Sequence, residues 1–515
     1  MKSAMDLLGE LLRLRASVTI ESGNLRVHAP SGNISPELLK QVSLNKPEII
    51  RLLQRQTPLR RRADGALPVL SFAQQRLWVL EQLAPGSPAY NLSLLHRFSG
   101  ELDIEALQGA VDSLVGRQES LRTTFVSEGG KPLQVIAPEL RLTVDVEAVE
   151  SEEALEVRLK ALCAEPFDLT RGPLLRMRVL RLSGTEQMLL LVMHHIISDG
   201  WSMGVFFREL AVFYAGKRRG KPANLPVLPV QYLDYALWQR EWLQGEELAR
   251  QVAYWKRQLA GAPPVLELPT DRPRPAMQSY RGRFIIHTIP VQLTESIKGL
   301  MHREGATLFM GLAAALFVLL SRWSGQCDLV VGTPIAGRQR SELEGLIGFF
   351  VNMLALRADL SGDSSFVDFL AQVKRVALDA YAHQDLPFEK LVEVINPQRV
   401  TTHAPIVQVT IGLHNEPNET LSLDGLEVLR QLQPVETTKF DLSIQVAESG
   451  STLLISFQYN SDLFDPSTIG RMVQHYERLL EGVVENPERR ISELSLLTES
   501  ERRQLLFDWN RTERA

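Results

Sequence analysis

The feature that most limits how this chain can fold is the stretch Leu189–Ser202, where an unbroken apolar run leads into two histidines. The five residues from Leu189 to Met193 precede the pair without any polar or turn-forming residue. Continuous apolar character of this kind predicts a strand that is buried on both faces. Because a helical pattern from Met203 to Tyr214 follows, a strand, a tight turn and a helix are expected in that order.

His194 and His195 close the predicted strand. Neighbouring side chains of a strand point to opposite faces, so the two histidines are expected to take different roles. One would pack against the interior or a structural partner, and the other would face a cavity at the strand end. Asp199 lies on the turn, where its carboxylate can orient or brace the neighbouring groups. Gly200 has no side chain, so another group can come close to the backbone there. Taken alone, the pattern favours plain hydrogen-bonded core histidines.

Length and charge argue against several classes of protein. At 515 residues the chain is too long for one compact core, so two or three domains are expected. Its formal net charge of −5 argues against a general nucleic-acid binder. No signal-peptide pattern opens the sequence, and the apolar helix expected over Leu308–Leu320 is too short for a membrane span. Cys163 and Cys327 lack metal-ligand spacing, so a reducing cytoplasm is expected.

Residues 1–56 are predicted to form a small unit of their own. Apolar residues repeat at helical spacing from Met5 to Leu12, and two strand patterns flank Ser22–Asn24 as in a hairpin. Helix starts are predicted at Ser35–Glu37 and Asn45–Glu48, each with proline at the first helical position.

The remainder of the chain alternates strand and helix patterns. Residues 57–68, with three consecutive arginines, are expected to form a solvated linker. Prolines break the chain near residue 270, where we place the boundary between two lobes, 69–270 and 271–500. The last segment, 501–515, is expected to lead out of the second lobe.

His194–Gly200 spells HHxxxDG, and with this motif the chain resembles the condensation domains of nonribosomal peptide synthetases. The resemblance extends from about residue 69 to the end of the sequence. It departs from the family pattern at Gln118, where the family usually has histidine, and at Val400, which replaces an aspartate. The other matching motifs are Ser71–Trp78, Gln118–Phe125, Tyr232–Trp238, Gly345–Asn352 and His383–Glu389, with a weak match over Thr402–Gln408.

The resemblance implies an α/β fold in which two chloramphenicol-acetyltransferase-like lobes form a V around a central channel, preceded by a small α+β docking domain. It implies that His195 faces the channel as the catalytic residue and that the Gly200 N–H is a candidate donor to the oxyanion. His194 and Asp199 would support the site, with Asp199 paired to Arg338 of the second lobe. The residues expected to line the substrate channel are Trp201, Ser202 and Asn352.

The same resemblance implies an N-acyltransferase that forms an amide bond between an acyl thioester and the amine of a carrier-bound aminoacyl group. An imidazole with an ordinary pKa of about 6.5 can orient the amine or accept its proton at neutral pH. No metal and no directly bound cofactor are expected. The substrates would instead arrive on phosphopantetheine arms or, for the donor, on coenzyme A.

Two kinds of donor are compatible with the sequence. A starter-type domain would take a fatty acyl group from acyl-CoA and initiate a lipopeptide, and the altered motif near Pro405 favours it slightly. An elongating domain would take an L-peptidyl or acyl group from an upstream carrier protein. Residues 1–56 resemble the docking domains of tubulysin synthetase subunits, which would bind the tail of an upstream synthetase by strand addition. Trp509–Thr512 resembles the lead-in to an adenylation domain, the expected neighbour.

Three other functions agree with parts of the sequence. Gly200–Gly204 spells G-x-S-x-G between a strand and a helix, the context of a serine hydrolase whose nucleophile would be Ser202. A metal site could use His194, His195 and Asp199, although adjacent strand residues diverge. A non-catalytic module could recruit carrier proteins, although the intact motif favours an enzyme. Substitution tests the first alternative, because a hydrolase needs Ser202 and a condensation domain needs His195.

Overall fold

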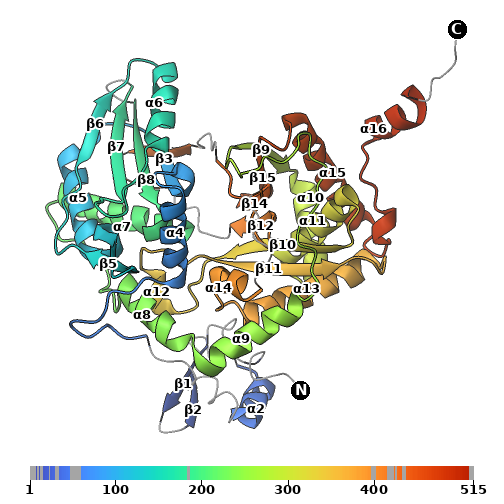
Figure 1. The fold of residues 1–515 in the computed structure, drawn as a ribbon, viewed down its shortest axis with the longest axis horizontal. Coiled ribbons are helices and arrows are strands. Elements are labelled where there is room, and N and C mark those ends of the chain that lie inside the picture. The colour runs from blue at the N-terminus through green and yellow to red at the C-terminus, as the bar shows by residue number, and fades with distance from the viewer. Residues whose placement is uncertain are drawn as a thin grey trace.

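The fold is described from a computed structural model of the chain (Figure 1). The structure describes residues 7, 11, 16–21, 24–28, 34–46, 59–182, 186–395, 402–414, 421, 423, 426–431 and 437–509. Most of the helix predicted from Met5 to Leu12 lies outside these residues. So do half of the second predicted helix start (Pro47 and Glu48), the motif position Val400 and the end of the expected lead-in, Asn510–Thr512.

The N-terminal unit contains the predicted hairpin and helix. Strand β1 (Ser17–Glu21) pairs antiparallel with β2 (Asn24–His28), and helix α2 (Pro36–Leu44) follows. The Ser35 hydroxyl accepts the Leu38 N–H at 3.2 Å, which is the cap expected from the Ser-Pro-Glu sequence. The buried apolar residues of this unit form a small core of Leu7, Leu11, Ala16, Leu38 and Val42.

The first lobe is built on a five-stranded sheet in the order β13-β3-β8-β7-β6. Strand β8 lies at its centre between antiparallel neighbours and is buried from its second residue onward, as its apolar run predicts. The elements of this lobe are α4 (Phe72–Leu83), η1 (Pro88–Tyr90), β3 (Asn91–Ser99), α5 (Ile104–Arg117), η2 (Glu119–Arg122), β4 (Thr123–Glu128), β5 (Lys131–Ile136), β6 (Val144–Ala148), α6 (Glu152–Ala164), β7 (Leu175–Arg181), β8 (Glu186–His194), η3 (His195–Ile197), α7 (Gly200–Arg218) and α8 (Tyr232–Trp242).

The second lobe is built on a mixed six-stranded sheet in the order β11-β10-β12-β14-β15-β9. Strand β12 runs parallel to β10 and β14, and the other pairs are antiparallel. The elements of this part of the chain are α9 (Gly245–Gln258), β9 (Gly282–Ile289), α10 (Val291–Arg303), α11 (Leu308–Ser324), β10 (Asp328–Ile335), α12 (Ser341–Glu344), β11 (Asn352–Asp359), α13 (Phe366–Ala382), α14 (Phe388–Ile395), β12 (Val409–His414), β13 (Glu427–Gln431), β14 (Leu442–Ser449), β15 (Thr452–Asn460), α15 (Pro466–Glu485), η4 (Ile491–Glu493), α16 (Glu499–Arg503) and a π turn (Gln504–Asp508).

The two lobes diverge from a common base that contains α8 and α9 (Figure 1). Two segments cross between them. The loop between β10 and β11, residues 336–351, is here named the crossing loop, and it places Leu346, Phe349 and Phe350 in the core of the first lobe. Strand β13 follows β12 in sequence but pairs with β3 of the first lobe. The crossing loop brings Phe349 against His195 at the end of β8, whereas β13 pairs with the part of β3 that lies opposite the start of β8.

The packing changes from one lobe to the other before the predicted boundary at residue 270. Tyr254 and Trp255 of α9 lie in the core of the second lobe, and so do Leu266 and Leu268. The prolines near residue 270 therefore mark a loop within the second lobe. Proline positions do not show where the packing passes from one lobe to the other. The sequence of an amphipathic helix such as α9 is compatible with packing on either lobe.

The predicted solvated linker is wrong at Leu59 and Arg62, whereas Arg60 and Arg61 between them are exposed as expected. Leu59 is buried, and the Arg62 guanidinium forms ion pairs at 3.0 Å with both Glu119 and Asp234. The Asp234 carboxylate is fully shielded from solvent. One arginine of the basic triplet thus exchanges water for two carboxylates and fixes the linker to the first lobe.

Helix α11 is a core helix, as predicted, and is buried from Phe309 to Leu320. Among the described residues no single helix is long and apolar enough to cross a membrane. Helices α10 and α11 reach that length and apolar character only when they are taken together, and the pair is bent by 104°.

Candidate active site

The predicted histidines lie at the end of β8, where the chain turns at once. His194 ends the strand, and His195 begins the 3-10 turn η3. The Nδ1 of His195 lies 2.8 Å from the carbonyl oxygen of Ser198. Because a carbonyl oxygen can only accept, Nδ1 carries the hydrogen and Nε2 keeps a lone pair in the neutral ring. The half-buried ring packs 4.7 Å from the ring of Phe349 on the crossing loop.

His194 has a different environment, as predicted, although the reason differs from the prediction because the strand ends at His194 and His195 already belongs to the 3-10 turn. It is 2% exposed, and its Nδ1 accepts the Ile196 N–H at 3.2 Å. The rings of Tyr90 and Phe167 lie 6.4 Å and 6.2 Å from its ring. His194 is therefore a buried packing residue with a fixed hydrogen bond.

Both imidazoles are held in the neutral form. Burial, and next the charge of Lys439, lower the pKa of His194 to about 3. The same causes, in the same order, hold the pKa of His195 well below its ordinary 6.5. The two Nδ1 atoms engage different groups, and no three His, Cys, Asp or Glu side chains of the described residues are arranged to hold a metal ion.

Asp199 caps α7 and joins the lobes. One of its carboxylate oxygens accepts the Ser202 N–H at 2.9 Å, and the other accepts the Phe350 N–H at 2.9 Å. Arg338 donates to the first oxygen at 3.2 Å, with both side chains almost fully buried. Arg338 also donates to the Leu346 carbonyl at 2.8 Å. The ion pair expected from the resemblance is therefore present, and it fastens the crossing loop to the histidine turn.

Gly200 and Trp201 open α7. Gly200 is exposed and is the first helical residue, a position whose N–H has no acceptor within the helix. Its role as an oxyanion donor stays a prediction. The Trp201 indole donates to the Glu344 carbonyl at 3.0 Å, so this half-buried side chain holds the crossing loop.

Ser202 does not line a channel, so that prediction is wrong. Its side chain is fully buried, and its hydroxyl hydrogen lies between Asp199 at 2.7 Å and the Gly348 carbonyl at 2.9 Å. The oxygen accepts from the Gly348 N–H at 3.1 Å and from Arg338 at 2.8 Å. A nucleophilic serine needs a reachable oxygen and an adjacent base, so this network also contradicts the serine hydrolase.

The buried network changes the result expected for Ser202→Ala. The variant leaves the Gly348 N–H and one Arg338 N–H without an acceptor, which should lower the free energy of unfolding by about 1–3 kcal/mol. Amide formation per folded molecule should stay within about threefold of the wild type, because the hydroxyl does not touch the reacting groups. Chemical denaturation and a condensation assay measure the two effects. Unchanged stability together with complete loss of activity would restore Ser202 as the nucleophile.

Gln118, which stands where the family usually has histidine, holds the crossing loop. Its amide donates to the Gly345 carbonyl at 3.0 Å and to the Glu209 carboxylate at 3.1 Å. Its oxygen accepts the Ile347 N–H at 3.1 Å. The Gln118 amide group has both donors and an acceptor, so this one side chain joins the crossing loop to Glu209 of α7.

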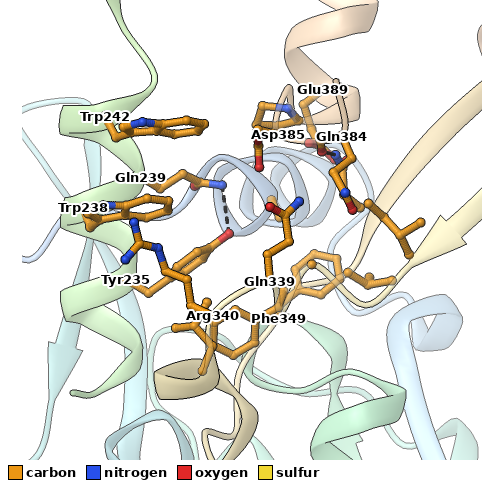
Figure 2. Close-up of a pocket in the computed structure, with 18 residues that line it drawn as sticks. Tyr235, Trp238, Gln239, Trp242, Gln339, Arg340, Phe349, Gln384, Asp385 and Glu389 are labelled. Atoms are coloured by element: carbon orange, nitrogen blue, oxygen red, sulfur yellow. Dashed lines mark hydrogen bonds between the residues drawn. The ribbon is translucent and has the colours of Figure 1, made fainter. Parts of the chain in front are cut away.

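A cavity opens between α8, the crossing loop and the connection from α13 to α14 (Figure 2). Trp238 and Trp242 stack on the α8 side, with ring centres 5.2 Å apart. Asp385 lies across the cavity from them, and burial raises its pKa to about 6. Phe349 lines the cavity and its ring also packs against His195, so this side chain lies between the cavity and the histidine turn.

Asn352, expected to line the substrate channel, lies in the wall of this cavity. Its amide donates to the carbonyls of Gln384 and Leu386 at 2.9 Å and 2.8 Å. Its oxygen accepts the Phe388 N–H at 2.9 Å. The side chain is thus fully engaged in holding the start of α14 against β11.

Comparison with known proteins gives the family. Residues 67–506 match the Condensation domain family, and residues 5–55 match the TubC N-terminal docking domain family. The chain belongs to the condensation domain family. Condensation domains of nonribosomal peptide synthetases catalyse amide-bond formation, an acyltransferase reaction.

The curated relatives of this condensation domain are synthetases. A linear gramicidin synthase of Brevibacillus parabrevis is 46% identical over 479 residues, which cover 90% of this chain and 6% of that protein. Chondramide synthase of Chondromyces crocatus is 42% identical over 452 residues, which cover 87% of this chain and 12% of that protein. The chain thus spans a small part of the relatives that it matches.

Solved structures confirm the predicted fold of the condensation domain. The X-domain of teicoplanin biosynthesis, in its complex with OxyB, is 31% identical with a TM-score of 0.79, over 86% of this chain and 99% of that chain. The condensation domain of the Monacolin K polyketide synthase is 22% identical with a TM-score of 0.74, over 83% and 99% of the two chains. Two acetyltransferase-like lobes are therefore present.

Several groups beside the site of this condensation domain are not predicted from the sequence. Phe349 reaches His195 from the crossing loop, and Lys439 acts on both histidines from the second lobe. Arg76 of α4 pairs with Glu389 of α14 at 3.2 Å, which links the lobes. Arg76, Phe349 and Glu389 lie inside the matched motifs, so the motifs could have indicated them. Lys439 lies outside every motif.

Proposed function

We propose that this domain joins an acyl or peptidyl group, delivered as a thioester by an upstream carrier protein, to an aminoacyl group on a second carrier protein. His195 carries the proposal, because its neutral ring donates through Nδ1 and keeps a lone pair on Nε2. The acceptor amine attacks the thioester carbonyl, the C–N bond forms, and the C–S bond breaks to release the donor thiol. The amine proton leaves through Nε2 of His195.

The other residues of the turn support this reaction. The N–H of Gly200 donates to the oxyanion, since it opens a helix whose N-terminal dipole favours negative charge. Asp199 and Arg338 hold the turn against the crossing loop. Confinement of two tethered substrates in one channel supplies a large part of the rate, because it turns a bimolecular step into an effectively unimolecular one.

The proposed partners follow from the chemistry and from the docking-domain match. Both substrates come on phosphopantetheine arms, so the domain needs no cofactor of its own. The docking unit, which matches over residues 5–55, receives the tail of an upstream synthetase by strand addition to the β1–β2 hairpin. An adenylation domain follows the condensation domain in the synthetase.

A starter-type function with a fatty acyl-CoA donor is the second candidate. The sequence over Thr402–Gln408 departs from the motif of ordinary elongating domains, and on that ground the sequence alone favours lipopeptide initiation slightly. The docking-domain match favours an upstream synthetase as the source of the donor. Three subunits of linear gramicidin synthase are each 46% identical to this chain. This similarity also favours a donor that comes from an upstream carrier protein.

Intact-protein mass spectrometry separates the two donors. A phosphopantetheinylated carrier protein loaded with a panel of amino acids is incubated with the domain and either a series of acyl-CoAs or an acyl-loaded carrier protein. We expect the acyl mass increment on the acceptor carrier only with the carrier-bound donor, and no increment with His195→Ala. An increment from acyl-CoA alone that requires His195 would establish the starter function instead.

A further inference from the structure

One aromatic side chain of the crossing loop separates the cavity from His195. The ring of Phe349 lies 4.7 Å from the ring of His195 and is tilted by 58° to it. The same side chain lines the cavity, together with Tyr235, Trp238 and Trp242 of α8 (Figure 2). Because Phe349 is only 9% exposed, its ring forms a closed wall between the imidazole and the cavity.

The backbone that carries Phe349 is fixed by side chains of the first lobe. Its carbonyl accepts the Tyr232 hydroxyl at 2.6 Å, and the N–H of the following Phe350 donates to Asp199 at 2.9 Å. The preceding Gly348 lies so close to Tyr232 that a Cβ there would be 1.9 Å from the ring. The direction in which the Phe349 side chain leaves the backbone is therefore set on both sides.

The cavity behind Phe349 is too small to take an amino-acid side chain of the size of phenylalanine. Its volume is about 60 Å³. Since one water molecule needs roughly 10–15 Å³ of such space, the cavity has room for a few water molecules only. If the Phe349 ring were absent, the volume of the ring would be added to the cavity, and the enlarged space would open beside His195.

The acceptor side chain lies close to the imidazole in the proposed reaction. Nε2 of His195 takes the proton of the attacking amine, so the amine nitrogen lies at hydrogen-bond distance from it, about 3 Å. The α-carbon and the β-carbon of the aminoacyl group follow, one covalent bond further each. The first atoms of the side chain therefore lie within a few ångströms of the imidazole, which is also the range in which Phe349 packs on it.

We propose that Phe349 is a specificity-determining residue, whose ring closes the wall beside His195 and so limits the size of the acceptor side chain. This inference rests on the proposed function and deepens it, because the limit acts on the acceptor of that reaction. A large side chain meets a ring that the fixed backbone holds in place, and a close-packed wall yields little. The transition state for a large acceptor is therefore less stable than that for a small one.

Phe349→Ala and Phe349→Leu test this inference through the ratio of kcat/KM for a tryptophanyl carrier protein to kcat/KM for an alanyl carrier protein. The donor is the same acyl carrier protein throughout, and the amide is followed by intact mass. The ratio should rise by about tenfold or more in Phe349→Ala and by about threefold in Phe349→Leu. A loss of folded protein lowers both values alike, so a purely structural role leaves the ratio unchanged. Ratios within about twofold of the wild type in both variants would overturn the inference.

Trp242→Ala supplies the matched control, because it enlarges the same cavity from the α8 side and leaves the wall at Phe349 in place. Its ratio should stay within about twofold of the wild type. A rise equal to that of Phe349→Ala would mean that the cavity is already open to the substrates, which contradicts the wall.

A second series keeps the alanyl acceptor and varies the length of the donor acyl chain. If Phe349→Ala changes the preference among donors and not among acceptors, the inference is wrong. The proposed function fails separately, when the wild-type domain forms no amide from any carrier-bound donor or forms it without His195. An active wild type whose ratio does not respond to either Phe349 variant rejects the inference alone.

Discussion

His195→Ala is expected to slow amide formation by about a hundredfold to ten-thousandfold, the range for loss of a positioned acid–base group. The Ser198 carbonyl holds the Nδ1–H at 2.8 Å, so the variant removes an Nε2 lone pair of defined direction. Because the ring is half-buried and neutral, the free energy of unfolding should fall by less than about 2 kcal/mol. Single-turnover formation of the amide, followed by intact mass on folded protein, measures the loss.

The neighbouring histidine supplies the matched control. His194→Ala removes a buried ring that accepts the Ile196 N–H, so it should lower the free energy of unfolding by about 2–4 kcal/mol. Its folded fraction should be more active than His195→Ala. His195→Asn keeps a donor for the Ser198 carbonyl but has no Nε2, and it should be as slow as the alanine variant. Activity of His195→Ala within about fivefold of the wild type would reject the proposed role.

The histidine turn could be predicted because its geometry is local. An apolar strand that ends in two histidines, followed by a capping Asp199 and a helical pattern, contains in one stretch what orients His195. Helix α7 nevertheless starts at Gly200, three residues before the expected Met203, because the Asp199 carboxylate accepts the Ser202 N–H. Local chemistry therefore determines the turn.

Contacts from the second lobe could not be predicted from local patterns. Ser202 lies in a motif of a nucleophile, and only the Gly348 and Arg338 contacts, from residues more than a hundred positions away, show that its hydroxyl is buried. Strand β13 pairs with β3 across the lobes, and its own sequence carries no sign of that partner. Lys439 likewise reaches the Tyr90 ring of the first lobe through the packing of the lobes. The Asp199–Arg338 pair was expected from the family resemblance, not from spacing.

Asp199→Ala is expected to lower the free energy of unfolding by about 3–5 kcal/mol, the cost of removing one partner of a buried ion pair. The Arg338 guanidinium, with a side chain 1% exposed, would lose its carboxylate, and α7 would lose its cap. The Phe350 N–H would also lose its acceptor. Activity should fall with stability, because the carboxylate holds the histidine turn and the crossing loop together. Denaturant unfolding and the condensation rate of the folded protein measure the two effects.

A double-mutant cycle with Arg338 shows whether the loss comes from the ion pair. Arg338→Met alone leaves a buried Asp199 carboxylate without its cation, and Asp199→Asn alone leaves a buried cation without its carboxylate. The double variant removes both charges, so its loss should be smaller than the sum of the single losses by about 1–3 kcal/mol. Additive losses would mean that the Ser202 and Phe350 hydrogen bonds of Asp199, rather than the charge of Arg338, hold the lobes together at this point.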